Sequence, residues 1–121
     1  MPKALVVDDS IVIRKMVGKI LSENGHEYVQ AENGQEALEI FESQDFNIVI
    51  TDINMPIMNG FELASAIRKS SNGHSNIPII VLSTEFSDEV KAEGKKIGVN
   101  AWMIKPCDED KLVAAISQLC N

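Results

Sequence analysis

The chain has 121 residues, 45% of them hydrophobic, which is enough for one domain with its own core. The formal net charge is −7 and the basic residues form no cluster, so a nucleic-acid-binding role is disfavoured. No apolar stretch is long enough to cross a membrane, and residues 1–3 lead directly into an apolar run without a signal peptide. These features predict a single cytoplasmic domain.

Short apolar runs alternate with amphipathic segments along the chain. The runs are bounded by turn residues, which predicts buried parallel strands, and the segments between them repeat their apolar residues at helical spacing. Asn33 is the predicted cap of the second helix, with Glu36 as its capping-box partner. In chain order we predict a strand over 3–8, a helix over 10–23, a strand over 27–31, a helix after residue 33, a strand over 46–52, a helix over 61–69, a polar loop over 70–76, a strand over 79–82, a helix over 88–97, a strand over 101–104 and a helix over 108–119.

This alternation predicts an α/β domain with right-handed crossovers. The fold class is a doubly wound, three-layer (βα)5 sandwich of the flavodoxin-like type, with one five-stranded parallel sheet. We expect the strand order 2-1-3-4-5, with the ligand cleft beside the first and third strands.

Polar or charged residues end four of the five predicted strands. They are Asp8 and Asp9, Asp52, Ser83 and Lys105. The ends of parallel strands meet at one edge of a sheet, so we expect these side chains to share a pocket. Carboxylates 4–5 Å apart repel by about 3–4 kcal/mol per pair at an effective dielectric of 20, so the cluster needs a cation or bound protons. Oxygen ligands with no His or Cys nearby favour Mg²⁺.

Asp52 is the candidate nucleophile, because a carboxylate can attack phosphorus and form an acyl phosphate. That chemistry needs a metal to offset charge on the phosphoryl oxygens and a fixed cation opposite it, for which Lys105 is the candidate. Ser83 can hydrogen-bond a phosphoryl oxygen. Each residue alone has a plainer interpretation: the acids after the first strand as helix-capping groups, Lys105 as a surface lysine and Ser83 as a strand-end hydroxyl. The hypothesis therefore depends on all of them occurring together.

The remaining reactive side chains lie away from these strand ends. Cys107 and Cys120 flank the last predicted helix, about 20 Å apart at 1.5 Å per residue, which is too far for a disulfide. We expect free thiols there. His26 and His74 fall in predicted loops and are expected to be solvated.

Several segments of the chain resemble those of a known family. The segments 6–10 and 50–56, with Gly60, Ser83 and Lys105-Pro106, are similar to the receiver domains of two-component response regulators. The similarity covers the whole chain and is strongest to CheY-like, stand-alone receivers of chemotaxis. It implies one receiver domain over 1–121 with no output domain. Such a domain is not an enzyme for other substrates and catalyses only its own phosphorylation and dephosphorylation.

The resemblance also assigns the metal and phosphoryl groups. It makes Asp52 the phosphoacceptor. Asp9 and Asp52 bind Mg²⁺ directly, Asp8 acts mainly through water, and Asn54 contributes its backbone carbonyl. Asn54 and Glu85 flank the site and are expected to influence the rate of dephosphorylation.

Three further residues are assigned to signalling by the same resemblance. Lys105 pairs with the phosphoryl group, and Ser83 is the switch hydroxyl that binds it. Trp102 takes the place of the switch aromatic, and the Lys105-Pro106 peptide is usually cis in the family. The expected phosphodonor is a histidine kinase. The expected target is a protein such as the flagellar motor switch, bound through the fourth helix, fifth strand and fifth helix of a monomeric domain, with no nucleic acid or membrane involved.

Three alternatives stay open from the sequence. The chain can be a phosphorelay shuttle or another stand-alone receiver outside chemotaxis. It can be an Asp-nucleophile phosphatase of the haloacid-dehalogenase type, although such enzymes carry Asp-x-Asp after the first strand and position 54 here is Asn. An FMN binder would need a phosphate loop rich in Ser, Thr and Gly at 8–12, where this chain has two acids.

Overall fold

The computed structural model describes residues 2–71 and 73–120, so residue 72 of the predicted polar loop and residues 1 and 121 of the predicted domain lie outside it. Strands and helices alternate along the described chain as predicted, and no described helix combines the length and apolar character needed to cross a bilayer. The elements are β1 (Lys3–Val7), α1 (Ile11–Glu23), β2 (Glu27–Ala31), α2 (Gly34–Ser43), β3 (Ile48–Thr51), α3 (Gly60–Arg68), β4 (Ile79–Ser83), α4 (Asp88–Ile97), β5 (Ala101–Ile104) and α5 (Glu109–Leu119).

The strands form one parallel sheet in the order β2-β1-β3-β4-β5, which confirms the predicted topology. Val7 at the end of β1 is paired with Thr51 at the end of β3, so the residues that follow these strands start level with each other. Ser83 at the end of β4 is likewise paired with Ile104 at the end of β5. This register brings the ends of four strands to one edge of the sheet.

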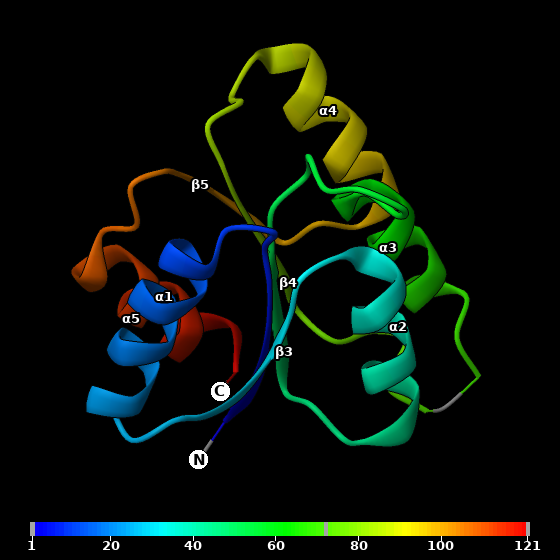
Figure 1. Cartoon of the computed structure of the whole chain (residues 1–121). Coiled ribbons are helices and arrows are strands. Elements are labelled where there is room, and N and C mark those ends of the chain that lie inside the picture. Colours follow the sequence, from blue (N-terminus) through cyan, green and yellow to red (C-terminus); the bar gives the residue numbers. More distant parts are fainter. Residues whose placement is uncertain (1, 72, 121) are drawn as a thin grey trace.

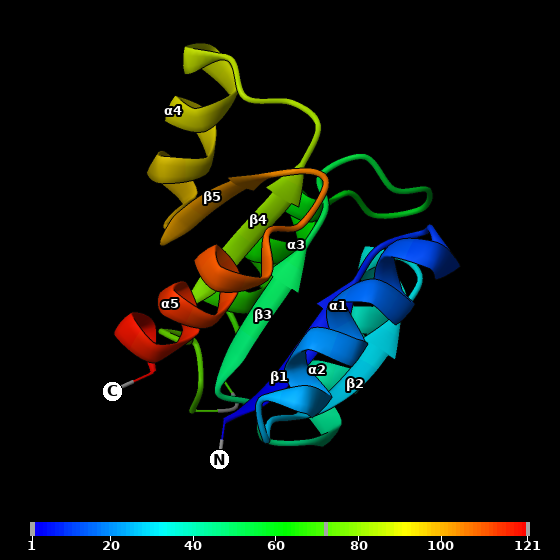
Figure 2. The ribbon, with the colours of Figure 1, turned by 90° about the vertical axis from the view of Figure 1, so that its left-hand side faces the viewer.

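Helices cover both faces of the sheet, as a three-layer fold requires. Helices α1 and α5 pack on one face, and α2 and α3 pack on the other (Figures 1 and 2). Alternate residues of a strand point to opposite faces, so Val6 faces α1 and α5 while Leu5 and Val7 face α2 and α3. Both faces are apolar because both are buried, which explains the continuous apolar runs in the sequence.

Two strands end one residue before their predicted end at the polar edge, whereas β4 runs one residue further than predicted, to Ser83. Strand β1 ends at Val7 rather than at residue 8, and β3 ends at Thr51 rather than at residue 52. The residues beyond keep only one ladder bond each: Asp52 N–H donates to Val7 O at 3.0 Å and Asp8 N–H to Ala31 O at 3.1 Å. The acids thus lie just past the strands, at positions fixed by the sheet.

The predicted capping box at Asn33 is only half formed. The Asn33 side chain accepts from Glu36 N–H at 2.8 Å, but the Glu36 carboxylate accepts from Glu32 N–H at 3.2 Å and not from Asn33. The complete capping box is at the start of α3, where Asn59 and Glu62 bond each other's backbone N–H groups at 2.8 and 2.9 Å. This box fixes the end of the loop that follows β3.

Gly60 closes that loop onto the strand. Its N–H donates to Ile53 O at 2.8 Å, and a Cβ at this position would overlap the carbonyl oxygen of Asp52. Only glycine permits so close an approach of the two backbones. The backbone of Asp52 is therefore held by β1 on one side and by the start of α3 on the other.

Replacing Phe41 tests how tightly the core is packed. It is fully buried among the side chains between the sheet and α2. We expect Phe41→Ala to lower the free energy of unfolding by about 3–5 kcal/mol, because it leaves a cavity that the core cannot fill. The control is Phe86→Ala, whose side chain is 54% exposed and whose loss should change stability by about 0.5 kcal/mol or less. Urea denaturation measures both, and equal losses in the two variants would contradict the packing described here.

Candidate functional site

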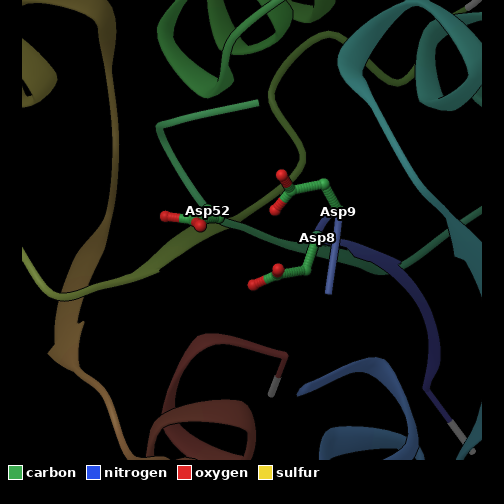
Figure 3. Close-up of side chains that lie close together, drawn as sticks. All are labelled: Asp8, Asp9 and Asp52. Atoms are coloured by element: carbon green, nitrogen blue, oxygen red, sulfur yellow. The ribbon is translucent and has the colours of Figure 1, made fainter. Parts of the chain in front are cut away.

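Three carboxylates lie together at the carboxyl edge of the sheet (Figure 3). Asp8 and Asp9 follow β1, Asp52 follows β3, and each side chain offers an oxygen such that these oxygens lie within 4.8 Å of one another. Asp8 and Asp52 are buried, whereas Asp9 is exposed. The sequence prediction that the strand ends bring these acids together is confirmed.

Lys105 supplies the positive charge of the site. Its Nζ lies 2.8 Å from Asp8 Oδ2 and 2.9 Å from Asp52 Oδ2, and the lysine side chain is only 15% exposed. Because β4 separates β3 from β5, the lysine side chain reaches past the end of one strand to contact the other two. The Lys105-Pro106 peptide is cis, as the family resemblance implied. One ammonium offsets part of the repulsion within the acidic group and leaves it with excess negative charge.

Burial and ion pairing act in opposite directions on these groups. Burial raises the pKa of Asp8, and the hydrogen bonds from Lys105 and from Ser10 N–H oppose this without cancelling it. Burial by itself lowers the pKa of Lys105, but the hydrogen bonds and charges of Asp8 and Asp52 outweigh it and leave that pKa raised. Lys105 therefore stays protonated at neutral pH, and Asp8 takes up a proton at a higher pH than a surface aspartate does.

The Asp52 carboxylate is held in one orientation. Its Oδ1 accepts from Ile53 N–H at 2.7 Å, and its Oδ2 accepts from Lys105 Nζ at 2.9 Å. The Asp52 side chain is 9% exposed, so only a small part of its surface faces solvent. A carboxylate fixed in this way would lose little further freedom on forming a bond.

Ser83, Glu85 and Asn54 are joined by hydrogen bonds in and next to the loops that follow β3 and β4. Ser83 is fully buried at the end of β4, and its hydroxyl oxygen accepts from Glu85 N–H at 3.1 Å. The hydroxyl proton can still be donated elsewhere. The Asn54 side-chain amide donates to Glu85 Oε2 at 2.7 Å, which links the loop after β3 to the loop after β4. The sequence analysis placed Asn54 and Glu85 beside the site but did not predict this bond. The sequence signal for this bond was that Asn54 lies two residues after Asp52 and Glu85 lies two residues after Ser83.

Trp102 lies on β5 at the side of the site that faces α4. Its indole Nε1–H donates to the carbonyl oxygen of Glu85 at 2.8 Å. The half-buried ring lies 6.1 Å from the Phe61 ring, centroid to centroid, and a Cβ at Gly94 would come within 2.9 Å of it. The indole hydrogen bond was not predicted from the sequence. It connects the predicted switch aromatic to the same loop that contacts Ser83.

The histidines and cysteines lie outside this group. His26 is half-buried and its Nδ1 is inaccessible, with no hydrogen-bond partner within 2–71 and 73–120, so the expectation that it is solvated is wrong. His74 is part-exposed, and its Nε2 lies 2.9 Å from Asp45 Oδ1. Cys107 and Cys120 are free thiols as predicted, and burial raises the pKa of Cys107 to about 11.

The donor set of the acidic group fits a magnesium ion. All three candidate side-chain ligands are carboxylates, with no imidazole or thiol among them. Magnesium prefers such oxygens, uses few protein ligands and keeps several waters, which suits a group with one exposed member. The site residues Asp8, Asp9 and Asp52 therefore match the metal that the sequence predicted.

The comparison with known proteins identifies the family. Residues 4–117 match the family model described as the response regulator receiver domain. The chain belongs to the response regulator receiver domain family.

The chain is similar to proteins of several kinds. Chemotaxis protein CheY1 of Helicobacter pylori is 42% identical over 106 residues, covering 86% of this chain and 85% of that protein. The solved structure of chemotaxis response regulator CheY4 of Vibrio cholerae has a TM-score of 0.91 and 41% identity, covering 98% of both chains. The sensor kinase/phosphatase CqsS of Vibrio cholerae is 37% identical over 115 residues, but this chain spans only 17% of it. The chain likewise spans 47% of the length of the probable transcriptional regulator ycf27 of Cyanophora paradoxa.

The position of Lys105 predicts how the site responds when its cation is removed. We expect Lys105→Ala to stay folded and to bind Mg²⁺ at least as well as the wild type. Binding should become tighter, because the ammonium no longer competes with the metal for Asp8 and Asp52. Isothermal titration calorimetry measures the affinity, with Lys111→Ala, an exposed lysine on α5, as the control for net charge. Weaker binding in Lys105→Ala alone would contradict the predicted competition between the ammonium and the metal.

Proposed function

We propose that this chain is a phosphorylation-activated response regulator of a two-component system. It accepts a phosphoryl group from a histidine kinase on Asp52 and changes its affinity for a protein partner. The observation that carries this proposal is the Lys105 ammonium bonded to both Asp8 and Asp52, with a third carboxylate beside them. A fixed cation, a buried carboxylate nucleophile and a metal-binding acid pair are the groups that phosphoryl transfer to aspartate needs.

The transfer itself is an exchange of one bond for another. An Asp52 carboxylate oxygen bonds to phosphorus while the bond from phosphorus to the donor's imidazole nitrogen breaks. The electron pair stays on that nitrogen, which then takes up a proton. Mg²⁺, when bound, offsets the negative charge of the phosphoryl oxygens. Asp9 and Asp52 would hold it directly, Asp8 mainly through water and Asn54 through its backbone carbonyl.

Two residues then bind the transferred group. Lys105 already bonds an Asp52 oxygen at 2.9 Å, so it reaches a phosphoryl oxygen on the same carboxylate with a small movement. Ser83 donates its hydroxyl proton to another phosphoryl oxygen. Hydrolysis of the acyl phosphate by water restores the Asp52 carboxylate. In this proposal the chain catalyses its own phosphorylation and dephosphorylation and is not an enzyme for other substrates.

The signal leaves the site through the face formed by α4, β5 and α5. A phosphoryl group adds a charge of about −1.5 to −2, which draws Ser83 and the loop after β4 toward it. Glu85 in that loop bonds both Ser83 and Trp102, so the indole is the first side chain of this face to respond. Ile104, 48% exposed on β5, offers the partner an apolar contact. Phosphorylation thus shifts an equilibrium between two arrangements of the same face.

Chemotaxis is the pathway that we propose first, with a component of the flagellar motor switch as the target. The support is the similarity to chemotaxis proteins, such as the chemotaxis protein CheY homolog of Campylobacter jejuni, 39% identical over 106 residues. We place the chain in the cytoplasm as a monomer, without nucleic-acid or membrane partners. Its net charge of −7 is consistent with the absence of a nucleic-acid partner.

A phosphorelay is the second candidate, and the match to the sensor kinase/phosphatase CqsS favours it. In that case the phosphoryl group on Asp52 passes to a histidine of another protein. Purified chain charged with ³²P-phosphoryl on Asp52 distinguishes the two roles. Transfer of the label to a histidine phosphotransferase supports the relay, whereas binding of the charged chain to a motor-switch protein without transfer supports chemotaxis.

The phosphoacceptor is tested directly with a small-molecule donor. We expect acetyl phosphate and Mg²⁺ to add one phosphoryl group to the wild type and none to Asp52→Asn, because asparagine keeps the size of the side chain but is not a nucleophile. Intact-mass spectrometry measures the addition, and Asp45→Asn, an exposed aspartate at the opposite end of the sheet, is the control that should still be labelled. Labelling of Asp52→Asn would mean that another residue is the acceptor.

Trp102 is the only tryptophan and therefore reports on the switch. We expect beryllofluoride with Mg²⁺ to shift its fluorescence emission to the blue as the half-buried ring becomes more buried, and Mg²⁺ alone to change it little. Ser83→Ala should show a smaller shift, because the hydroxyl that moves toward the phosphoryl group is gone. Unchanged emission in wild-type protein, with beryllofluoride binding confirmed by calorimetry, would rule out Trp102 as part of the switch.

A further inference from the structure

Arg14 makes contacts that the proposed phosphoryl chemistry does not use. It lies on the first turn of α1, and its Nη1 donates to the backbone carbonyl oxygen of Asp8 at 2.7 Å. Its Nε donates to Gln30 Oε1 on β2 at 3.1 Å. Within residues 2–71 and 73–120 this half-buried arginine has no carboxylate at ion-pair distance. Its guanidinium is thus used to hold a peptide group at the metal site.

The peptide that Arg14 holds joins the two acids that follow β1. Asp8 itself is anchored on every side: its N–H donates to Ala31 O at 3.1 Å, its Oδ1 accepts from Ser10 N–H at 2.9 Å and its Oδ2 contacts Lys105. Its carbonyl oxygen is the remaining group, and Arg14 binds it. The backbone of Asp8 is therefore held at its N–H group by Ala31 and at its carbonyl group by Arg14. The second contact fixes the orientation of the Asp8–Asp9 peptide.

Asp9 has no such anchor of its own. It is exposed, and in the described part of the chain its carboxylate makes no hydrogen bond or ion pair. The position of this carboxylate therefore depends on where its own backbone lies, and the bond from Arg14 to the Asp8 carbonyl fixes the peptide group that joins Asp9 to Asp8. Residues that orient metal ligands through hydrogen bonds commonly matter for metal affinity almost as much as the ligands do.

We propose that Arg14 is a positioning residue for the metal site, which holds the Asp8–Asp9 peptide so that Asp9 points toward Asp52. This inference rests on the proposed Mg²⁺ site. It makes a prediction opposite in sign to that of simple electrostatics. Removing a positive charge near three carboxylates should strengthen cation binding if charge alone matters. Loss of the positioning contact should weaken it.

The test is Mg²⁺ titration by calorimetry at fixed ionic strength, for four variants beside the wild type. We expect Arg14→Met to bind Mg²⁺ about 10-fold more weakly, in the range seen for outer-shell partners of metal ligands. Arg14→Lys keeps the charge and one donor and should recover part of this loss. Gln30→Ala removes no charge but frees the Nε of Arg14, so it should weaken binding by a smaller factor. Thermal unfolding in EDTA checks that each variant is folded.

Lys15→Met is the matched control. Lys15 is the next residue of α1, is exposed and makes no hydrogen bond or ion pair with another described residue, so its loss changes the net charge by the same amount. It should leave Mg²⁺ affinity unchanged or slightly increased. Equal or tighter binding in Arg14→Met, or equal weakening in Lys15→Met, would overturn the role of Arg14 and leave the proposed function intact. A wild-type chain that binds no Mg²⁺ would overturn both.

Discussion

The ammonium group of Lys105 lies 2.8 Å from Asp8 and 2.9 Å from Asp52, and this arrangement depends on the whole sheet. The three residues follow β5, β1 and β3, which are not consecutive in the sheet because β4 lies between β3 and β5. Only parallel strands in register bring their ends to one edge. Each partly buried charge is costly unless it is paired. The lysine makes a cluster of carboxylates tolerable in the absence of metal, and the same contact places a cation where a phosphoryl group on Asp52 would need it.

The surroundings of this ion pair divide into a rigid part and an adjustable part. The backbone of Asp52 is held by β1 on one side and by Gly60 on the other, through contacts that do not depend on side-chain rotation. The loop after β4 is held mainly through Glu85. Its N–H, carbonyl and carboxylate groups bond Ser83, Trp102 and Asn54, respectively. In the proposed switch, a change at Ser83 would reach the indole through a single residue, Glu85.

Much of this could be predicted from the sequence, for a physical reason. Strands that are buried on both faces have continuous apolar sequences. A charged residue at the end of such a sequence therefore lies at the polar edge of the sheet. The grouping of Asp8, Asp9, Asp52 and Lys105 follows from these strand-end positions and from the predicted strand order.

What could not be predicted was the choice of hydrogen-bond partner. Glu36 bonds Glu32 rather than Asn33, because more than one N–H is within its reach and the local backbone decides between them. Arg14 looks from its spacing like a solvated helix residue, and only the fold shows that it reaches the Asp8 carbonyl. His26 also looked solvated, but the packing around it encloses its Nδ1. Such contacts depend on the tertiary arrangement of neighbouring elements and leave no periodic signal in the chain.

A crystal structure with Mg²⁺ and beryllofluoride tests most directly whether Lys105 and the three carboxylates form a phosphoryl-accepting site. We expect beryllium bonded to a carboxylate oxygen of Asp52, a metal ion held by Asp9 and Asp52, and Lys105 Nζ within hydrogen-bond distance of a fluorine. We also expect the Ser83 hydroxyl to contact a second fluorine. Beryllofluoride bound at another residue, or bound at Asp52 with Lys105 still paired only to Asp8, would contradict the proposed site.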